Sequence, residues 1–203
     1  MNTGFDAQSD RPVVNIVGEL VALGPQRKDL LPVYQRWIND FQTVRHLGSY
    51  PRPLTFEQEE AWLVDAGKAA NEIGFTIYEK ATWWPIGNTS LMTINYRNRT
   101  AVFGILIGEP DMRGRGYGTE TARLTLDYAF TALGLHSVSL LVSAGNLAGR
   151  RAYAKAGFRE FGRQRQCTWV GGAFQDTIHM DCLASEFTSP VPAEILAPDR
   201  PKE

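Results

Sequence analysis

The 203-residue chain has few residues of the types that would settle its class at once. It has two cysteines, three histidines and a net charge of −1. Cys167 and Cys182 form no C-x-x-C pair and are too few for a disulfide framework, so we expect reduced thiols. His46, His136 and His179 lack the spacing of a metal site, and we expect no bound metal. Because no excess of basic residues is present, we expect no nucleic-acid partner.

Long apolar segments are also absent. No run of the chain approaches the ~20 apolar residues that span a membrane. Residues 1–12 have neither the basic nor the apolar part of a secretory signal, so we expect a cytoplasmic protein with no membrane partner. Residues 1–12 and the Pro-rich residues 188–203 have little to bury, and we expect both to be flexible around a single domain of residues 13–187.

The chain does contain a glycine-rich loop between an apolar segment and a helix. Residues 107–119 read I-G-E-P-D-M-R-G-R-G-Y-G-T. The N–H groups in the first turn of a helix lack partners within the helix, and the helix dipole adds positive charge there. The junction is therefore suited to binding a diphosphate through the main chain. The spacing fits neither a Walker A motif, which needs Lys after its last glycine, nor the dinucleotide motif G-x-G-x-x-G.

Hydrophobic periodicity predicts the regular elements around this loop. Strands are expected over residues 13–23, 75–79, 86–96, 100–107, 137–142, 158–165 and 175–183. Helices are expected over residues 29–39, 55–70, about 116–133 and 147–156. Thr55 and Gln58 form a capping box at the start of the second helix. This order predicts a single mixed α/β (α+β) domain with a mostly antiparallel central sheet flanked by about four helices.

Several segments, in this order, resemble the GCN5-related N-acetyltransferase (GNAT) family. Arg113-x-x-Gly116-x-Gly118 is similar to the family's R/Q-x-x-G-x-G/A signature for the coenzyme A diphosphate. Residues 146–158 (N-L-A-G-R-R-A-Y-A-K-A-G-F) are similar to its N-x-x-A/S-x-x-x-Y-E-K-x-G-F helix. Residues 126–136 and the two segments 157–166 and 176–180 resemble the branch that acetylates ribosomal-protein N-termini and polyamines. The resemblance covers residues 18–187.

This resemblance implies the GNAT fold, acetyl-CoA as the cofactor, and a cleft where the strand ending at Ile107 splays from the strand ending near Val142. A strand N–H group is expected to bind the thioester oxygen, and Asn146 to bind the pantetheine arm or to cap its own helix. The arginines are expected to bind phosphate or to be solvated. The expected cofactor-binding residues are Ile105, Leu106, Ile107, Arg113, Gly114, Arg115, Gly116, Tyr117, Gly118, Thr119, Asn146, Arg150 and Tyr153, with Arg151 as an alternative to Arg150.

Transfer of an acetyl group to an amine also needs an acid and a base. Tyr153 is the candidate acid, because relatives place a tyrosine hydroxyl near the sulfur; the alternative is a tyrosine that only packs. Many members of the branch carry Glu in an A-E-x-G strand, where this chain has Ala101-Val-Phe-Gly104. Glu109 and Asp176 are the nearest candidate bases. Either is alternatively a structural acceptor, with water removing the proton.

The acceptor is expected to bind at residues 40–54, because coenzyme A occupies the opposite side. That segment has no acidic cluster for a polyamine, and its Arg45 and Arg52 suit an acceptor with a carboxylate or phosphate. Trp84, beside Trp83, is expected to line the acceptor pocket, to contact a second copy of the chain, or to fold over its hairpin. The acceptor is a small-molecule amine or a peptide N-terminus, and the protein a monomer or homodimer.

The resulting hypothesis is an N-acetyltransferase that moves an acetyl group from acetyl-CoA to a primary amine by direct attack in a ternary complex. One alternative is a non-catalytic acyl-CoA-binding or regulatory module, and another is an acyltransferase that uses a longer acyl-CoA. A third is an interaction protein that uses Trp83, Trp84 and the Pro-rich tail.

Overall fold

The structure is a computed structural model, in which residues 11–47 and 51–188 are described. The strands are β1 (Ile16–Val17), β2 (Val21–Pro25), β3 (Ile73–Glu79), β4 (Pro85–Asn95), β5 (Thr100–Ile107), β6 (Ser137–Ser143), β7 (Arg159–Val170) and β8 (Ala173–Leu183). The helices are α1 (Leu31–Asn39), α2 (Phe41–Val44), α3 (Phe56–Lys68), α4 (Tyr117–Asp127) and α5 (Leu147–Ala156). The segments expected to be flexible, 1–12 and 188–203, lie outside the described residues except for residues 11, 12 and 188.

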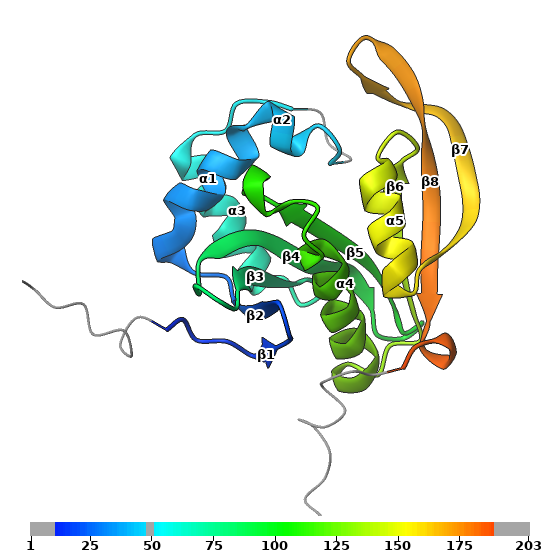
Figure 1. The fold of residues 1–203 in the computed structure, drawn as a ribbon, viewed down its shortest axis with the longest axis horizontal. Helices are drawn as coiled ribbons and strands as arrows, with labels where there is room; N and C mark the ends of the chain where they lie inside the picture. Colours follow the sequence, from blue (N-terminus) through cyan, green and yellow to red (C-terminus); the bar gives the residue numbers. More distant parts are fainter. Residues whose placement is uncertain (1–10, 48–50, 189–203) are drawn as a thin grey trace, which may run out of the picture.

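The strands form one eight-stranded sheet in the order β1-β2-β3-β4-β5-β6-β8-β7 (Figure 1). Every neighbouring pair is antiparallel except β5 and β6, which are parallel. The predicted fold class, a mixed α/β domain with a mostly antiparallel sheet, is confirmed. The four predicted helices are present, and the described residues add the short α2.

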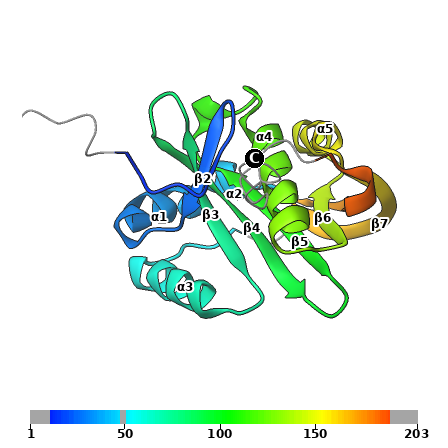
Figure 2. The same cartoon turned by 90° about the horizontal axis from the view of Figure 1, so that it is seen from below.

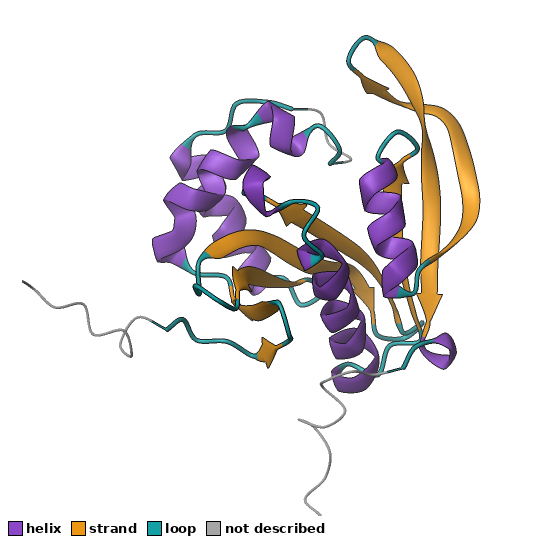
Figure 3. Cartoon of the chain, viewed as in Figure 1, coloured by secondary structure: helices purple, strands orange, loops and turns teal. Residues whose placement is uncertain are grey.

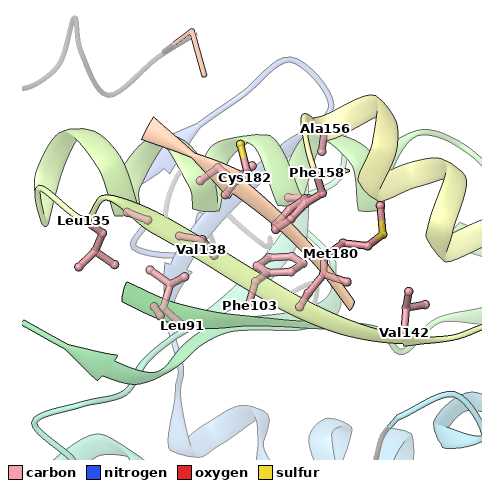
Figure 4. Close-up of a cluster of buried hydrophobic side chains, with 14 of the residues drawn as sticks. Leu91, Phe103, Leu135, Val138, Val142, Ala156, Phe158, Met180 and Cys182 are labelled. Carbon is pink, nitrogen blue, oxygen red and sulfur yellow. The ribbon is translucent and has the colours of Figure 1, made fainter. Parts of the chain in front are cut away.

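The helices cover the two faces of the sheet in separate groups. Figure 2 shows α1 and α3 on one side, and α4 and α5 on the other. Because side chains alternate along a strand, β5 serves both faces: Leu106 packs against α1, whereas Ile105 and Ile107 pack in the cluster that contains Leu124 of α4. The largest buried cluster lies under α4 and α5 and includes Phe103, Val138, Phe158 and Met180 (Figure 4).

The first predicted strand, over residues 13–23, is wrong as a single element. The chain turns at Glu19 and Leu20, so the segment forms the two short strands β1 and β2. The cause is Glu120 in the first turn of α4, whose carboxylate accepts the N–H groups of Glu19 at 2.6 Å, Leu20 at 2.7 Å and Val21 at 2.8 Å.

Two further elements differ from the sequence prediction. The helix expected to reach residue 133 changes after Asp127 into a π turn, η3 (Tyr128–Ala132), before Gly134. The hairpin of β7 and β8 is longer than expected, and it projects beyond the rest of the sheet (Figure 3). A register shift between Gln164 and Thr168 lets β7 continue to Val170 instead of ending at residue 165.

The parallel pair in the centre opens along its length. β5 and β6 pair only from Thr100 with Ser137 to Val102 with Ser139. Beyond these residues β5 pairs only with β4, and β6 pairs only with β8. The strands therefore splay apart towards Ile107 and Ser143, as the family resemblance implied.

Candidate functional site

The loop before α4 presents a series of unpaired backbone donors. The N–H groups from Gly114 to Gly118 donate to no other described residue. Gly116, the N-cap of α4, has φ +92° and makes no side-chain cap. Its positive φ, like that of Gly114 at +74°, is accessible to glycine and strained for other residues. The donors and the positive end of the helix dipole together form an anion-binding site.

The side chain of Arg113, at the start of this loop, is hydrogen-bonded within the protein and is not directed into solvent. Its Nε and Nη2 donate to the carbonyl of Ile107 at 3.1 and 3.0 Å. Nη2 also donates to Oγ1 of Thr43 in α2, at 2.8 Å. Arg113 therefore joins the end of β5, the glycine-rich loop and α2, and Nη1 is the part of the side chain left for a phosphate.

At the end of β5, some backbone N–H groups point into the gap between β5 and β6. Gly108 N–H donates to Ile86 O at 2.9 Å, which fixes this as a hydrogen-bonded pair of the antiparallel ladder. Because such pairs alternate, the N–H of Leu106 points to β4, whereas those of Ile105 and Ile107 point towards β6. Of the three predicted strand residues, Ile105 and Ile107 thus have the N–H groups available to a carbonyl oxygen.

Tyr153 of α5 lies across the splay from these groups. Its ring is held by edge-on contacts with Phe103 and Phe158, each with centroids 6.1 Å apart. Its hydroxyl makes no hydrogen bond to a described residue, unlike those of Tyr34 and Tyr117. Burial raises the pKa of Tyr153 to about 12. The phenol is therefore protonated at pH 7 and can donate.

The start of α5 is capped by Asn146. Its Oδ1 accepts the N–H of Gly149 at 2.9 Å, and its Nδ2 makes no hydrogen bond to a described residue. The capping alternative from the sequence is thus observed, and Nδ2 is the atom that the pantetheine alternative would use. Arg150 forms an ion pair with Glu160 at 2.7 Å and is not part of the cleft lining, so Arg151 is the arginine of α5 that lines the cleft.

These groups meet in one cleft of about 640 Å³ at the open end of the splay. Its lining comes from α2 and the residues after it, the end of β5, the glycine-rich loop and the start of α5. Of the sequence-predicted residues, the cleft brings together Arg45, Ile105, Leu106, Ile107, Arg113, Gly114, Gly116, Gly118, Thr119, Asn146 and Tyr153. Arg115 and Tyr117 do not line the cleft: their backbone N–H groups are unpaired among the described residues, and the hydroxyl of Tyr117 donates to Glu79.

The two candidate carboxylates do not line the cleft. Glu109 accepts from Trp37 Nε1 at 2.9 Å and pairs with Arg36. Burial raises its pKa, but the hydrogen bonds from Arg36 and Trp37 outweigh burial and hold the pKa below its ordinary value. Asp176 accepts from Gln166 N–H at 2.8 Å and Arg163 at 2.6 Å, which lower its pKa. Both acids therefore have structural partners and are weakened as bases.

His46 is the cleft residue that sequence reasoning missed. It lies beside Arg45, which donates from Nε to His46 Nε2 at 3.2 Å. Partial desolvation, together with the charges of Arg45 and Arg113, lowers the pKa of the largely exposed His46. The imidazole is thus neutral at pH 7. Only its position within residues 40–54, the expected acceptor segment, could have indicated that His46 lines the cleft, because a single histidine forms no recognisable motif.

Trp84 does not line the cleft, contrary to one of its predicted roles. It is 55% exposed on the hairpin between β3 and β4, and the neighbouring Trp83 lies under the guanidinium of Arg11 at 4.1 Å. Within the described part of the chain, no group of three or more His, Cys, Asp or Glu could hold a metal ion, and no helix is long and apolar enough to cross a membrane.

Comparison with known proteins places this cleft in context. Residues 20–159 match the model of the acetyltransferase (GNAT) domain. Spermidine N(1)-acetyltransferase of Vibrio cholerae is 35% identical over 102 residues, which are 50% of this chain and 58% of that protein. The chain therefore spans little more than half the length of this relative. Human alpha/beta-tubulin-N-acetyltransferase 9 is 27% identical over 157 residues, covering 71% of this chain and 75% of that protein.

Solved structures agree with the sequence matches. The crystal structure of spermidine N-acetyltransferase from Vibrio cholerae in complex with CoA and spermine superposes with a TM-score of 0.77 at 26% identity. The superposition covers 83% of this chain and 98% of that chain. The similarity thus extends over nearly the whole of that enzyme chain.

Proposed function

The chain belongs to the GNAT acetyltransferase family, and from this premise we propose that it transfers an acetyl group from acetyl-CoA to a primary amine by direct attack in a ternary complex. The observation that carries the proposal is the meeting of three groups in one cleft. They are the free N–H groups of Gly114 to Gly118, the splayed end of β5, and the unpaired hydroxyl of Tyr153.

The residues of the cleft fit coenzyme A at several points. The N–H groups before α4 suit the diphosphate, and the Nδ2 of Asn146 suits a pantetheine carbonyl. Arg151 and Lys155 also line the cleft and carry positive charge that suits the remaining phosphate. Bound in this way, the coenzyme supplies an activated acetyl thioester at the splay.

The transfer needs hydrogen-bond donors for the carbonyl oxygen, an acid for the sulfur and a base for the amine, and the cleft contains a residue for each. The N–H groups of Ile105 and Ile107 stabilise the negative charge that develops on the carbonyl oxygen. Tyr153 donates its proton to the departing sulfur, because its raised pKa keeps the phenol protonated. His46, neutral at pH 7, takes a proton from the ammonium group of the acceptor, directly or through water, once Arg45 releases its hydrogen bond to Nε2, and the resulting neutral amine attacks the thioester.

The predictions about the branch of the family, the location, the oligomeric state and the acyl donor also belong to the proposal. The resemblance of residues 126–136, 157–166 and 176–180 supports the branch that acetylates ribosomal-protein N-termini and polyamines. We keep the cytoplasmic location and the choice between monomer and homodimer as predictions from the sequence. A longer acyl-CoA is an alternative donor, and a binding module without turnover is the alternative to an enzyme.

A thiol-release assay tests the proposal. The purified protein is mixed with acetyl-CoA and a panel of amines, and free coenzyme A is measured together with the acetylated product. We expect product with at least one amine. Tight binding of coenzyme A with no product from any amine would instead establish the binding module, and propionyl-CoA or longer donors in parallel would identify a different acyl preference.

A further inference from the structure

The cleft has two walls that come from opposite faces of the sheet. The start of α4 and α5 contribute one wall, whereas residues 42–47 and Leu106 contribute the other. In Figure 1, α2 and the residues after it face α5 across the open end of the sheet. The groups assigned to coenzyme A and Tyr153 belong to the first wall. An amine that attacks the thioester must therefore approach along the second.

This second wall contains no carboxylate among the described residues. Its lining residues are Gln42, Thr43, Arg45, His46 and Leu47. In the sequence, residues 42–54 include Arg45, His46 and Arg52 and no Asp or Glu. An acceptor with a second positive charge would find no opposite charge in this segment.

The carboxylates nearest to the wall in the chain are already occupied. Asp40 caps α2, accepting from Gln42 N–H at 3.1 Å and from the hydroxyl of Thr43. Glu109 is held by Arg36 and Trp37. Neither is part of the cleft lining. To bind a cationic acceptor, either acid would have to give up these internal donors.

Arg45, in contrast, is exposed and has donors to spare. Its Nε is directed to His46, while Nη1 and Nη2 donate to no described residue. A guanidinium with two free amino groups is suited to a carboxylate or phosphate, which it binds with paired hydrogen bonds. Arg113, Arg151 and Lys155 also line the cleft, but they are assigned to the phosphates of coenzyme A, so Arg45 is the cation left for the acceptor.

We propose that the acceptor is a primary amine whose molecule also carries an oxyanion, a carboxylate or a phosphate, which Arg45 binds. This inference rests on the proposed acetyl transfer. It distinguishes the chain from its spermidine-acetylating relatives, because a polyamine brings only positive charge to a wall whose charged lining residue, among those described, is Arg45.

Matched acceptor pairs provide the test. Glycine is compared with glycinamide, β-alanine with its amide, 4-aminobutyrate with its amide, and phosphoethanolamine with ethanolamine, with spermidine as the polycationic arm. We expect kcat/KM to be at least tenfold higher for the anionic member of one pair, since a hydrogen bond to a charged group contributes roughly tenfold or more. The carboxylate and phosphate pairs show which oxyanion is preferred.

Variants of two arginines in the same segment make the test specific. Arg45→Gln is expected to remove the preference within the pair and to leave the affinity for coenzyme A, measured by calorimetry, unchanged. Arg52→Gln is the matched control, because Arg52 does not line the cleft, and it is expected to keep the preference. Arg45→Lys is expected to retain part of the preference, since it keeps the charge without the paired donors.

The outcomes separate this inference from the function on which it rests. If spermidine or the neutral amines are the better substrates, or if Arg45→Gln leaves the preference intact, acetyl transfer stands and the role of Arg45 is wrong. If no amine of any charge is acetylated, the proposed function fails and the inference fails with it.

Discussion

Nη2 of Arg113 donates a hydrogen bond of 2.8 Å to Oγ1 of Thr43, and this contact joins the glycine-rich loop to the wall of the cleft that residues 42–47 form. The same guanidinium donates to Ile107 O, a carbonyl that β6 would have satisfied if the strands had stayed paired. The guanidinium that satisfies the unpaired carbonyl of Ile107 thus also contacts the wall that contains Thr43.

Thr43→Val tests this connection. Valine is close to threonine in shape but cannot accept from Arg113, and hydrogen bonds to charged groups contribute about 1.5–3 kcal/mol. Since Thr43 is nearly buried and Arg113 keeps Ile107 O as an acceptor, we expect the dissociation constant of coenzyme A, measured by calorimetry, to rise roughly tenfold. Thr43→Ser keeps the hydroxyl and is the control. Equal affinities for both variants would show that the contact does not position the loop.

Tyr153→Phe tests the acid. The variant keeps the ring contacts with Phe103 and Phe158 and removes only the hydroxyl, so the fold and coenzyme binding should remain. We expect kcat to fall by ~10²-fold or more, the usual scale of general-acid effects. An unchanged kcat, with chemistry shown to be rate-limiting, would remove Tyr153 from the reaction.

The pH profile gives a second measurement for Tyr153. Burial disfavours the charged phenolate and raises the pKa to about 12, so the acid is still protonated at pH 10. We therefore expect no loss of kcat from this group between pH 7 and 10. A decrease centred near the ordinary tyrosine value of about 10 would contradict the assignment.

Gly116→Val tests the anion site. A Cβ there would require a backbone with φ +92° and would lie 3.3 Å from Cδ1 of Leu20, so the larger side chain would strain and displace the loop that carries the unpaired N–H groups. We expect coenzyme A binding to be lost in calorimetry. Gly172→Val, at φ +84° in the turn between β7 and β8, imposes similar backbone strain away from the cleft. If both variants lose binding equally, backbone strain in general and not displacement of this loop is the cause.

Local patterns in the sequence were sufficient for much of this architecture. The glycine spacing at residues 114–118 and the helix that ends at Gly157 depend on contacts within one or two turns. They were therefore predictable together with most strands. The turn at Glu19 and Leu20 was not predictable, because its hydrogen-bond acceptor is Glu120, about a hundred residues further along the chain.

The same limit applied to the candidate bases. Glu109 follows β5, next to the expected site of the chemistry, but its partner Trp37 comes from α1, 72 positions earlier in the sequence. A buried indole N–H needs an acceptor, and this requirement draws the carboxylate away from the cleft. His46 reaches the cleft because α2, a helix of four residues that periodicity cannot detect, turns the chain at Phe41.

His46→Gln tests the base that the fold brings to the cleft. Partial desolvation and the nearby cations disfavour the charged imidazolium, so the pKa of His46 lies below its ordinary value and the neutral base predominates above that pKa. For the wild type we expect kcat/KM to rise as the pH passes through this value and to level off below pH 7. The variant keeps a side-chain acceptor for Arg45 but cannot take up a proton. Its kcat should fall by ~10²-fold and the acidic limb of its profile should disappear. Retention of that limb at full rate would assign deprotonation to water and leave His46 with the role of orienting Arg45.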